Sequence, residues 1–542
     1  MISVPDLLYP EPQRRLDARA LREALTFAFA TGGTSESFSK IWELANFGAS
    51  DFSSDCFARE LFLGDFVARC LSFSIEGQKY VPERGHLQRL IAHPPRDLRV
   101  TQFRHEILRE LRDVPERAEE LGRLTAKIRS LVQHLEAPDR GKRYDAIGRR
   151  IDILRSLREI LDELSTAFTG AGTGLGRIRK FAQEQKQLPA YDTLINLLDH
   201  ESDRATIELR VKVGYDGELR SFQIVRAGEN QENPFYRSRF ARFLTKITLW
   251  LQGYGFREAE LLGRLTNAAF DGVQDCVISL FQLLVDMEFY LASLSLRKLS
   301  QSRGLETCLP EFKTAAEAQT ELEALFNPFL LLEERPPKSA HISASEHALV
   351  VITGPNSGGK TRLLQALALS QLLGQAGSFV PARRATLEVR HGLFVSLSHE
   401  ASSDQREGRL GTELLRIRRM FEELRFGSLV ILDELCSGTN PSEGEEIFEL
   451  VVSLLAELEP QAFITTHFLQ FASRLEKERP VSRLEFLQVE LDAHQNPTYG
   501  FVPGVATTSL AERTAERLGV TREALRELVD RARQQRPEAK HG

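Results

Sequence analysis

The chain has few cysteines and no long uninterrupted hydrophobic run. Its five cysteines are widely separated and form no Cys-x-x-Cys pair, which argues against a cysteine-built zinc site and a secreted disulfide framework. The most apolar stretch, residues 277–296, contains Asp286 and Glu288 and so falls short of the ~18 uninterrupted apolar residues that suggest a membrane span. The first residues also lack a basic start followed by an apolar stretch. We therefore predict a cytoplasmic protein with no membrane contact.

A strong excess of one charge is also absent. The net charge is −6, and any contact with nucleic acid must come from local basic surface, since the whole chain would repel a polyanion. With 42% hydrophobic and 27% charged residues, the composition is that of a folded protein. At 542 residues the chain is too long for one hydrophobic core, so two or more domains are expected.

Long helical patterns dominate from about Leu16 to Lys338. Apolar residues recur at spacings of three and four with charged residues between them, as at 115–134 and 149–168, and we interpret these charges as solvated helix faces. One interruption, at 205–225, alternates apolar and polar residues around a turn at 214–217, which predicts an inserted β-hairpin. The segment 227–234 has the composition of a loop.

The pattern changes after Pro336 and Pro337, where short apolar runs alternate with helical segments. This alternation is typical of a parallel sheet covered by helices. The predicted fold is an α/β domain preceded by a long, mainly α-helical region with a small β-hairpin. The predicted domains are a helical segment at 1–78, the helical region at 79–335, the α/β domain at 336–509 and a helical segment at 510–542.

A glycine-rich segment at 354–361 predicts a phosphate-binding loop. It follows an apolar strand at 347–353 and leads into a helical pattern at 362–373, which is the required context. Glycines let backbone N–H groups turn toward phosphate oxygens, and the helix amino terminus adds positive charge. Lys360 is expected to meet the β- and γ-phosphates of ATP, and Thr361 to bind Mg²⁺. The predicted nucleotide-binding residues are Gly354, Pro355, Asn356, Ser357, Gly358, Gly359, Lys360 and Thr361.

Two further strands supply the rest of a nucleotide site. An apolar run at 428–432 ends in Asp433 and Glu434, where a Mg²⁺ ligand and a carboxylate that activates water are needed. A run at 462–466 ends in His467, which we predict to sense the γ-phosphate by hydrogen bonding. The predicted catalytic residues are therefore Glu434 and His467, and the predicted cofactors are ATP and Mg²⁺.

Residues 353–361 resemble the corresponding loop of the MutS family of DNA mismatch-repair ATPases, within the wider ABC ATPase class. The resemblance continues in family order through 377–382, 433–444, 465–468 and 499–504. It is fainter over about 80–335, where 87–95, 104–108 and 325–329 are similar to family segments.

The resemblance implies a homodimer that grips duplex, mismatched or branched DNA as a clamp, with repair or recombination proteins as further partners. For the fold, it implies an α/β P-loop ATPase domain of ABC type at 336–509, preceded by a mainly α-helical core or lever region at 79–335. It also implies two composite ATP sites, each completed by a loop of the other subunit. The candidates for that contact are Ser437, Gly438, Thr439, Asn440 and Thr412. Asp404 and Gln405 resemble the segment that couples the nucleotide to conformational change.

The chain departs from the family in several places. Core-like sequence begins near residue 80, which leaves no room for the mismatch-reading domain, so no aromatic wedge is expected. Residues 407–413 replace a Ser-Thr-Phe-like element of the composite site, with Gly408, Gly411 and Thr412 as substitutes. The stretch 334–347 has no aromatic residue to stack on adenine, and the nuclease-like domain of a second MutS subfamily is not found after the ATPase-like region.

A basic and aromatic cluster follows the predicted hairpin. Arg237, Arg239, Arg242 and Lys246 lie near Phe235 and Tyr236, and the last three basic residues share one face of a helical pattern. They are candidate phosphate contacts, which would make DNA binding sensitive to salt. The alternative interpretation is an ordinary solvated helix face.

Two other functions compete with a DNA-gripping ATPase. The first is an ATP-gated protein-interaction module with no DNA role, favoured by the acidic net charge. The second is an ATPase subunit of an ABC transporter, disfavoured because no Leu-Ser-Gly-Gly-Gln element precedes Ser428.

Overall fold

The computed structural model describes residues 4–33, 35–137, 143–201, 206–213, 219–228, 255–313, 319–397, 409–436, 440–507 and 522–534. The chain forms two compact units, each assembled from segments that are separate in the sequence. Unit 1 comprises Met1–Ser50, Gly64–Leu299 and Gln375–Phe379, and unit 2 comprises Asp51–Leu63, Ser300–Gly374 and Val380–Gly542.

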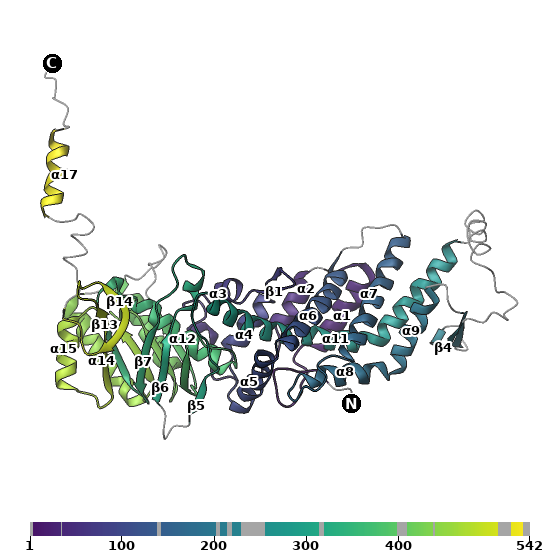
Figure 1. Ribbon diagram of the computed structural model, residues 1–542, viewed down its shortest axis with the longest axis horizontal. Helices are drawn as coiled ribbons and strands as arrows, with labels where there is room; N and C mark the ends of the chain where they lie inside the picture. The colour runs from purple at the N-terminus through teal and green to yellow at the C-terminus, as the bar shows by residue number, and fades with distance from the viewer. Residues whose placement is uncertain are drawn as a thin grey trace, which may run out of the picture. The chain divides into compact units, whose positions relative to one another are not determined.

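Unit 1 is mainly helical (Figure 1). Its helices are α1 (Ala18–Thr31), α2 (Ser35–Glu43), α3 (Leu63–Cys70), α4 (Arg84–Ala92), α5 (Leu98–Asp113), α6 (Pro115–Glu136), α7 (Arg143–Leu164), α8 (Gly176–Lys186), α9 (Pro189–Glu201) and α11 (Gly255–Ser302). A short antiparallel pair, β1 (Phe73–Ile75) and β2 (Gln78–Tyr80), lies among them. Capping residues begin some of these helices: the Asp17 carboxylate accepts from two backbone N–H groups of α1, and Pro115 opens α6.

The expected hairpin is present in unit 1. Strands β3 (Thr206–Val213) and β4 (Leu219–Gly228) pair antiparallel, and the turn at 214–217 lies outside the described residues. β4 runs to Gly228, further than the predicted end at Val225, because Thr206 pairs with Gly228 and Ile207 with Ala227. Residues 227 and 228, predicted to begin a loop, therefore belong to β4, and residues 229–234 of that prediction lie outside the described residues.

Helix α11 is the buried core helix of unit 1. By length and composition its segment Gly263–Ser302 could cross a membrane, with a mean hydropathy of 1.5, but the qualifying stretch is entirely buried inside the protein. Its two buried acidic residues are paired: Asp286 with Arg15, and Glu288 with Arg129. Burying a carboxylate without a partner costs several kcal/mol, so these pairs are what allow the helix to lie in the core.

Two segments that resemble the family meet inside unit 1. The buried Arg104 guanidinium donates to the backbone oxygen of Ala376 at 2.7 Å and to that of Leu8 at 3.0 Å. Gly377 has a φ of 85°, and a Cβ there would lie 2.8 Å from the Arg104 side chain. A glycine is thus required for both backbone conformation and close approach.

Unit 2 is an α/β unit with two sheets. The six-stranded sheet has the order β10 (Leu393–Ser396), β11 (Leu429–Leu432), β12 (Gln461–Thr465), β8 (Leu349–Thr353), β13 (Leu484–Leu491), β14 (Pro497–Pro503). Its strands are parallel except for β14. The four-stranded sheet has the order β5 (Glu311–Lys313), β9 (Arg384–Glu388), β6 (Gln319–Leu325), β7 (Ala340–Ser345).

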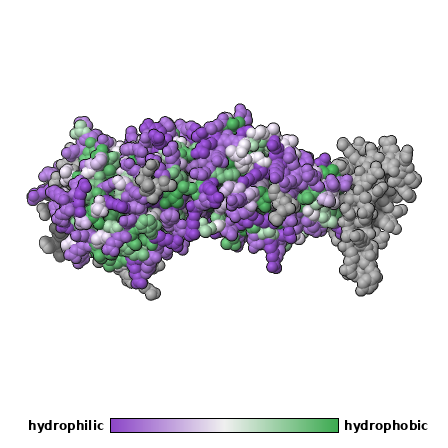
Figure 2. Space-filling model, turned by 90° about the horizontal axis from the view of Figure 1, so that it is seen from below, coloured by the Kyte–Doolittle hydropathy of each residue, from purple (hydrophilic) through white to green (hydrophobic). Residues whose placement is uncertain are grey.

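The helices of unit 2 follow the strands of the larger sheet. They are α12 (Lys360–Gln375), α13 (Arg409–Glu423), α14 (Pro441–Leu458), α15 (Leu469–Glu478) and α17 (Arg522–Gln534), with short 3-10 turns at Ser54–Cys56, Pro328–Leu332 and Asn356–Gly358. β8, β11 and β12 are buried along their whole length, as expected of parallel strands covered on both faces. Figure 2 shows hydrophilic surface interspersed with hydrophobic patches on the face in view.

The helical pattern expected as far as Lys338 in fact ends at Ser302. Strands β5 and β6 follow, and both belong to unit 2. β6 pairs with β7 and β9, which come later in the chain, so its identity as a strand depends on partners that no local pattern reveals.

Candidate active site

Parallel strands bring the central predicted residues to one edge of the six-stranded sheet. Leu432 lies opposite Ile464, and Ile464 lies opposite Val351, so β11, β12 and β8 end close together. The loop at 354–361 and the acidic pair after β11 therefore share this edge. In open parallel sheets, ligands bind beyond the carboxyl ends of the strands.

Close backbone packing shapes the loop that follows β8. A Cβ on Gly354 would lie 2.6 Å from the Val489 side chain, and one on Gly358 would lie 2.7 Å from it. Gly359 has a φ of 84° and faces the ring of Tyr499. Only glycine fits these positions without displacing β13 or straining the backbone. The loop is consequently fixed by packing from β13 and β14.

Lys360 opens α12 and is buried, with 3% of its surface exposed. Its Nζ donates to the backbone oxygens of Gly354 at 2.9 Å and Pro355 at 3.1 Å. Burial lowers the pKa of Lys360, while the negative charges of Glu434 and Asp433 act in the opposite direction. A cation held only by neutral carbonyls in a buried loop is well suited to receive an anion.

The Asp433 carboxylate is the centre of a hydroxyl network. Thr361 Oγ1 donates to Asp433 Oδ2 at 2.5 Å, and Thr465 Oγ1 donates to Asp433 Oδ1 at 2.6 Å. The hydroxyl of Thr361 and the carboxylate of Asp433 thus lie side by side. Both are the oxygen ligands that Mg²⁺ prefers, so these residues fit the predicted metal.

Glu434 follows with a left-handed backbone, at a φ of 49°. Its backbone N–H donates to Thr465 Oγ1 at 2.7 Å, which fixes the start of the turn. Non-glycine residues in this region of φ are uncommon and concentrate at functional sites. The half-buried Glu434 side chain is near enough to Lys360 for its negative charge to oppose the lowering of the lysine pKa by burial.

Thr465 is the functional residue that the sequence interpretation missed. One hydroxyl both accepts from Glu434 N–H and donates to Asp433, so it orients the two acidic residues together. The available signal was a hydroxyl residue at the end of a buried strand, in the run 462–466. The sequence pattern predicts a role only for the histidine that follows this run, and Thr465 enters only as part of the family-like segment 465–468.

Several predicted residues are not brought to this centre. His467 is exposed, and its ring lies 4.2 Å from that of Phe468. Asn440 caps α14, where its side chain accepts from Ser442 N–H, and Thr412 lies within α13. The other candidates lie outside the described residues: Ser437, Gly438, Thr439, Asp404, Gln405, Arg237, Arg239, Arg242 and Lys246.

Comparison with known families places this edge in context. Residues 350–537 match the model of MutS domain V. Residues 350–537 thus form a MutS-family domain. Domain V is the ATPase domain of the family, so the loop, Asp433 and Glu434 lie in its ATPase domain.

Similar MutS-family proteins match over part of their length. The chain is 33% identical to "Endonuclease MutS2" of Thermus thermophilus over 33% of this chain and 24% of the relative. It is 29% identical to "Endonuclease MutS2" of Thermomicrobium roseum, over 51% of this chain and 35% of the relative. It is 31% identical to "Endonuclease MutS2" of Symbiobacterium thermophilum, over 51% of this chain and 33% of the relative. The matches thus span about a quarter to a third of the relatives.

Proposed function

We propose that unit 2 binds ATP with Mg²⁺ at residues 354–361 and hydrolyses it. The observation that carries this proposal is the placement of the Thr361 hydroxyl and the Asp433 carboxylate 2.5 Å apart, at the start of the helix that Lys360 opens. Two oxygen ligands and a buried cation at one edge of a parallel sheet are the components that phosphoryl transfer requires.

Each residue at this edge of the sheet has its own proposed role. Backbone N–H groups of the loop and the amino terminus of α12 hold phosphate oxygens, and Lys360 neutralises the β- and γ-phosphates. Thr361 and Asp433 would hold Mg²⁺, which neutralises charge that develops on the phosphates. Glu434 orients and deprotonates the attacking water, and Thr465 keeps both carboxylates in position. His467 is proposed to approach the γ-phosphate from the exposed end of β12.

We propose further that the protein is a homodimer that grips duplex, mismatched or branched DNA and changes conformation with ATP. The match to MutS domain V supports this, and the candidate contacts with the partner's nucleotide remain Ser437, Gly438, Thr439, Asn440 and Thr412. Asp404 and Gln405 would couple the nucleotide to the conformational change. Phosphate contacts are proposed for Arg237, Arg239, Arg242 and Lys246. A cytoplasmic location and repair or recombination partners complete the proposal.

The relatives carry the name endonuclease, whereas the family model that matches residues 350–537 of this chain is that of MutS domain V, the ATPase domain. The proposal is therefore confined to ATP hydrolysis and DNA binding. A strand-cleavage assay on the same DNA substrates would detect a nuclease activity independently.

Titration of fluorescent homoduplex, mismatched and branched DNA, with and without ATP, tests the DNA part. We expect binding at low salt that weakens steeply as salt rises, because phosphate contacts release counterions. Glu434→Gln should bind ATP and retain the nucleotide-dependent change in DNA affinity while losing hydrolysis. Absence of binding to all three DNAs at low salt would refute the DNA proposal.

The acidic net charge of −6 favours one alternative, an ATP-gated module that binds a protein partner. Affinity capture with the Glu434→Gln protein separates the two. Recovery of nucleic acid without a stable protein partner supports the DNA proposal, and a nuclease-resistant protein partner supports the alternative.

A further inference from the structure

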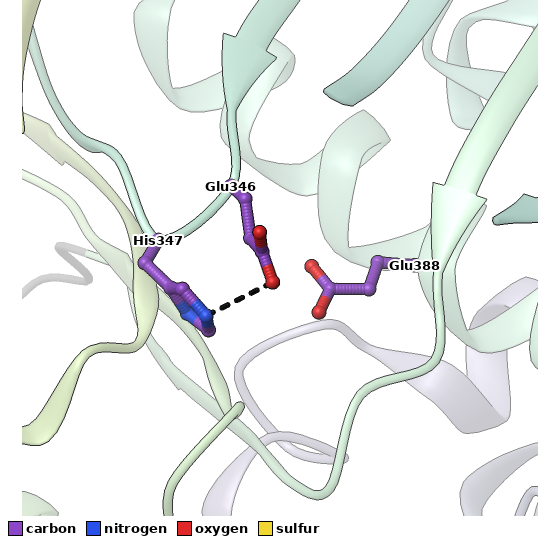
Figure 3. Close-up of side chains that lie close together, drawn as sticks. All are labelled: Glu346, His347 and Glu388. Carbon is purple, nitrogen blue, oxygen red and sulfur yellow. Dashed lines mark ion pairs between the residues drawn. The ribbon is translucent and has the colours of Figure 1, made fainter. Parts of the chain in front are cut away.

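A second cluster of ligand-type side chains lies at the opposite end of β8 from the phosphate loop. Glu346 and His347 occupy the turn between β7 and β8, and Glu388 ends β9. One donor atom from each residue lies within 4.8 Å of the other two. Figure 3 shows the carboxylates of Glu346 and Glu388 facing each other, with the imidazole beside them. Strand β8 separates the cluster from the residues assigned to ATP.

The spacing of the donors suits a shared ion. His347 Nε2 lies 3.1 Å from Glu346 Oε1. Two donors bound to one tetrahedral ion at about 2.1 Å are about 3.4 Å apart, so these two atoms are already close to that geometry. A donor oxygen of Glu388 lies within 4.8 Å of both atoms. A rotation of the Glu388 side chain would bring this oxygen to the same ion.

The imidazole faces the two carboxylates through Nε2. His347 is 8% exposed, and its Nδ1 is buried without a hydrogen-bond partner. The residue also has a φ of 55°, so the turn holds its side chain at the cluster by an uncommon backbone conformation.

The charge balance also favours a cation. Arg390 Nη1 forms an ion pair with Glu388 Oε2 at 2.9 Å, while its Nη2 donates to Gln461 Oε1 at 2.8 Å. Burial lowers the pKa of Arg390, and the charges of Glu388 and Glu346 both raise it. One guanidinium thus faces two carboxylates and a histidine. An ion pair through one oxygen of Glu388 still leaves the other able to coordinate a metal.

We propose that Glu346, His347 and Glu388 form a binding site for a divalent transition-metal ion of the zinc class. Imidazole and carboxylate donors suit Zn²⁺ and its neighbours, with water completing the coordination. The ion would join the turn before β8, in the larger sheet, to the end of β9, in the smaller one. It would therefore stabilise unit 2 without taking part in the chemistry proposed for ATP.

Calorimetric titration of untagged, full-length protein with Zn²⁺ tests the site. The measurements use an Asp433→Ala background, which removes the other predicted metal ligand. We expect one bound ion and a rise in Tm of several degrees, because a ligand that binds only the native state stabilises it. Replacement by Co²⁺ should give visible d–d absorption without the near-ultraviolet charge transfer that cysteine ligands produce.

Matched variants identify the ligands. Glu346→Gln leaves the Arg390 ion pair intact, and His347→Asn keeps a residue type that tolerates the left-handed backbone. Each should weaken Zn²⁺ binding at least about tenfold, whereas Glu321→Gln, an exposed residue of β6, should leave it unchanged. Circular dichroism of each variant controls for folding. No heat and no change in Tm with Zn²⁺, or unchanged affinity in both Glu346→Gln and His347→Asn, would overturn the proposal and leave an ion-pair network only.

Discussion

Arg15 in unit 1 and Lys360 in unit 2 are both buried cations, but their partners differ. The Arg15 guanidinium pairs with Asp286 and lies 3.5 Å from Asp6. Burial lowers the pKa of Arg15, yet the charges of Asp286 and Asp6 outweigh that effect and raise it overall. Lys360 donates only to two carbonyl oxygens, and its pKa is lowered because burial dominates.

The difference separates a structural charge from a binding charge. A buried cation that is matched by carboxylates belongs to the core, and removing one partner leaves an uncompensated charge. A buried cation that is held by carbonyls retains most of its capacity to bind an anion. Stability should therefore depend on the first kind and ligand affinity on the second.

The largest expected effect is on stability, from Asp286→Ala. This change leaves Arg15 buried without its main partner and should lower the free energy of unfolding by about 3–5 kcal/mol. Denaturant unfolding followed by circular dichroism measures it. Asp275→Ala is the matched control on α11, since its ion pair with Arg22 is about half exposed and should contribute less than about 1 kcal/mol. Equal losses in both variants would contradict the comparison.

Lys360→Ala should instead have a large effect on ligand affinity and a small effect on stability. We expect ATP affinity to fall about 100-fold or more, which corresponds to about 2.7 kcal/mol, while stability changes by less than about 1 kcal/mol because no carboxylate is left unpaired. Calorimetry with Mg²⁺ and a slowly hydrolysed ATP analogue measures the affinity. Arg362→Ala, an exposed neighbour on α12, is the control. Undiminished ATP binding by Lys360→Ala would remove the nucleotide assignment of this loop.

A third prediction concerns Glu83 in unit 1 and the pH dependence of stability. Burial, then the negative charge of Glu288, raises the pKa of Glu83 to about 7. Because the folded pKa lies above the unfolded value, the stabilising contribution of this carboxyl is fully present below about pH 4.5 and is lost as pH rises toward 7. The free energy of unfolding of Glu83→Gln, relative to that of the wild-type protein, should therefore rise by about 1–2 kcal/mol across that pH interval.

Denaturant unfolding at pH 4.5, 5.5 and 7 measures this difference. Glu11→Gln, an exposed carboxylate of unit 1, serves as the control and should follow the wild-type curve. A constant difference between Glu83→Gln and wild type across the interval would show that Glu83 keeps an ordinary pKa.

The smallest effect is expected for Thr465→Val. The substitution keeps the shape of the side chain and removes the hydroxyl that joins Asp433 to the Glu434 backbone. We predict that kcat for ATP falls about fivefold, or about 1 kcal/mol, with the Kd for ATP within about twofold. Thr465→Ser should restore the rate because it restores the hydroxyl. Failure of serine to do so would mean that packing, not hydrogen bonding, explains the loss.

The sequence predicted the local parts of the site well. β8 and α12 lie within a few residues of their predicted bounds, and Asp433 and Glu434 follow β11 as expected. Those features follow from short-range patterns: an apolar run, glycines, and a helical repeat. The acidic pair could also be placed near the loop, because parallel strands end at one edge of a sheet.

The parts that depend on distant pairing were not predicted. The role of Thr465 arises only when β12 lies beside β11, and the cluster of Glu346, His347 and Glu388 requires β9 to end near the turn before β8. The assignment of Asp51–Leu63 to unit 2 had no signal in the local sequence. No periodicity reports which strands or segments far apart in the chain become neighbours.

The Asp51–Leu63 segment limits how this protein can be divided for experiments. Within unit 2 its Asp51 carboxylate pairs with Arg425 at 3.1 Å, and its Glu60 carboxylate accepts the backbone N–H of Leu397, next to edge strand β10. A truncated protein that starts at Ser300 would lack this support and expose a sheet edge, a known route to aggregation. Poor solubility of such a fragment would reflect the missing Asp51–Leu63 segment and not low stability of the rest of unit 2. Isolating the unit calls for supplying residues 51–63 as a fused or co-expressed peptide.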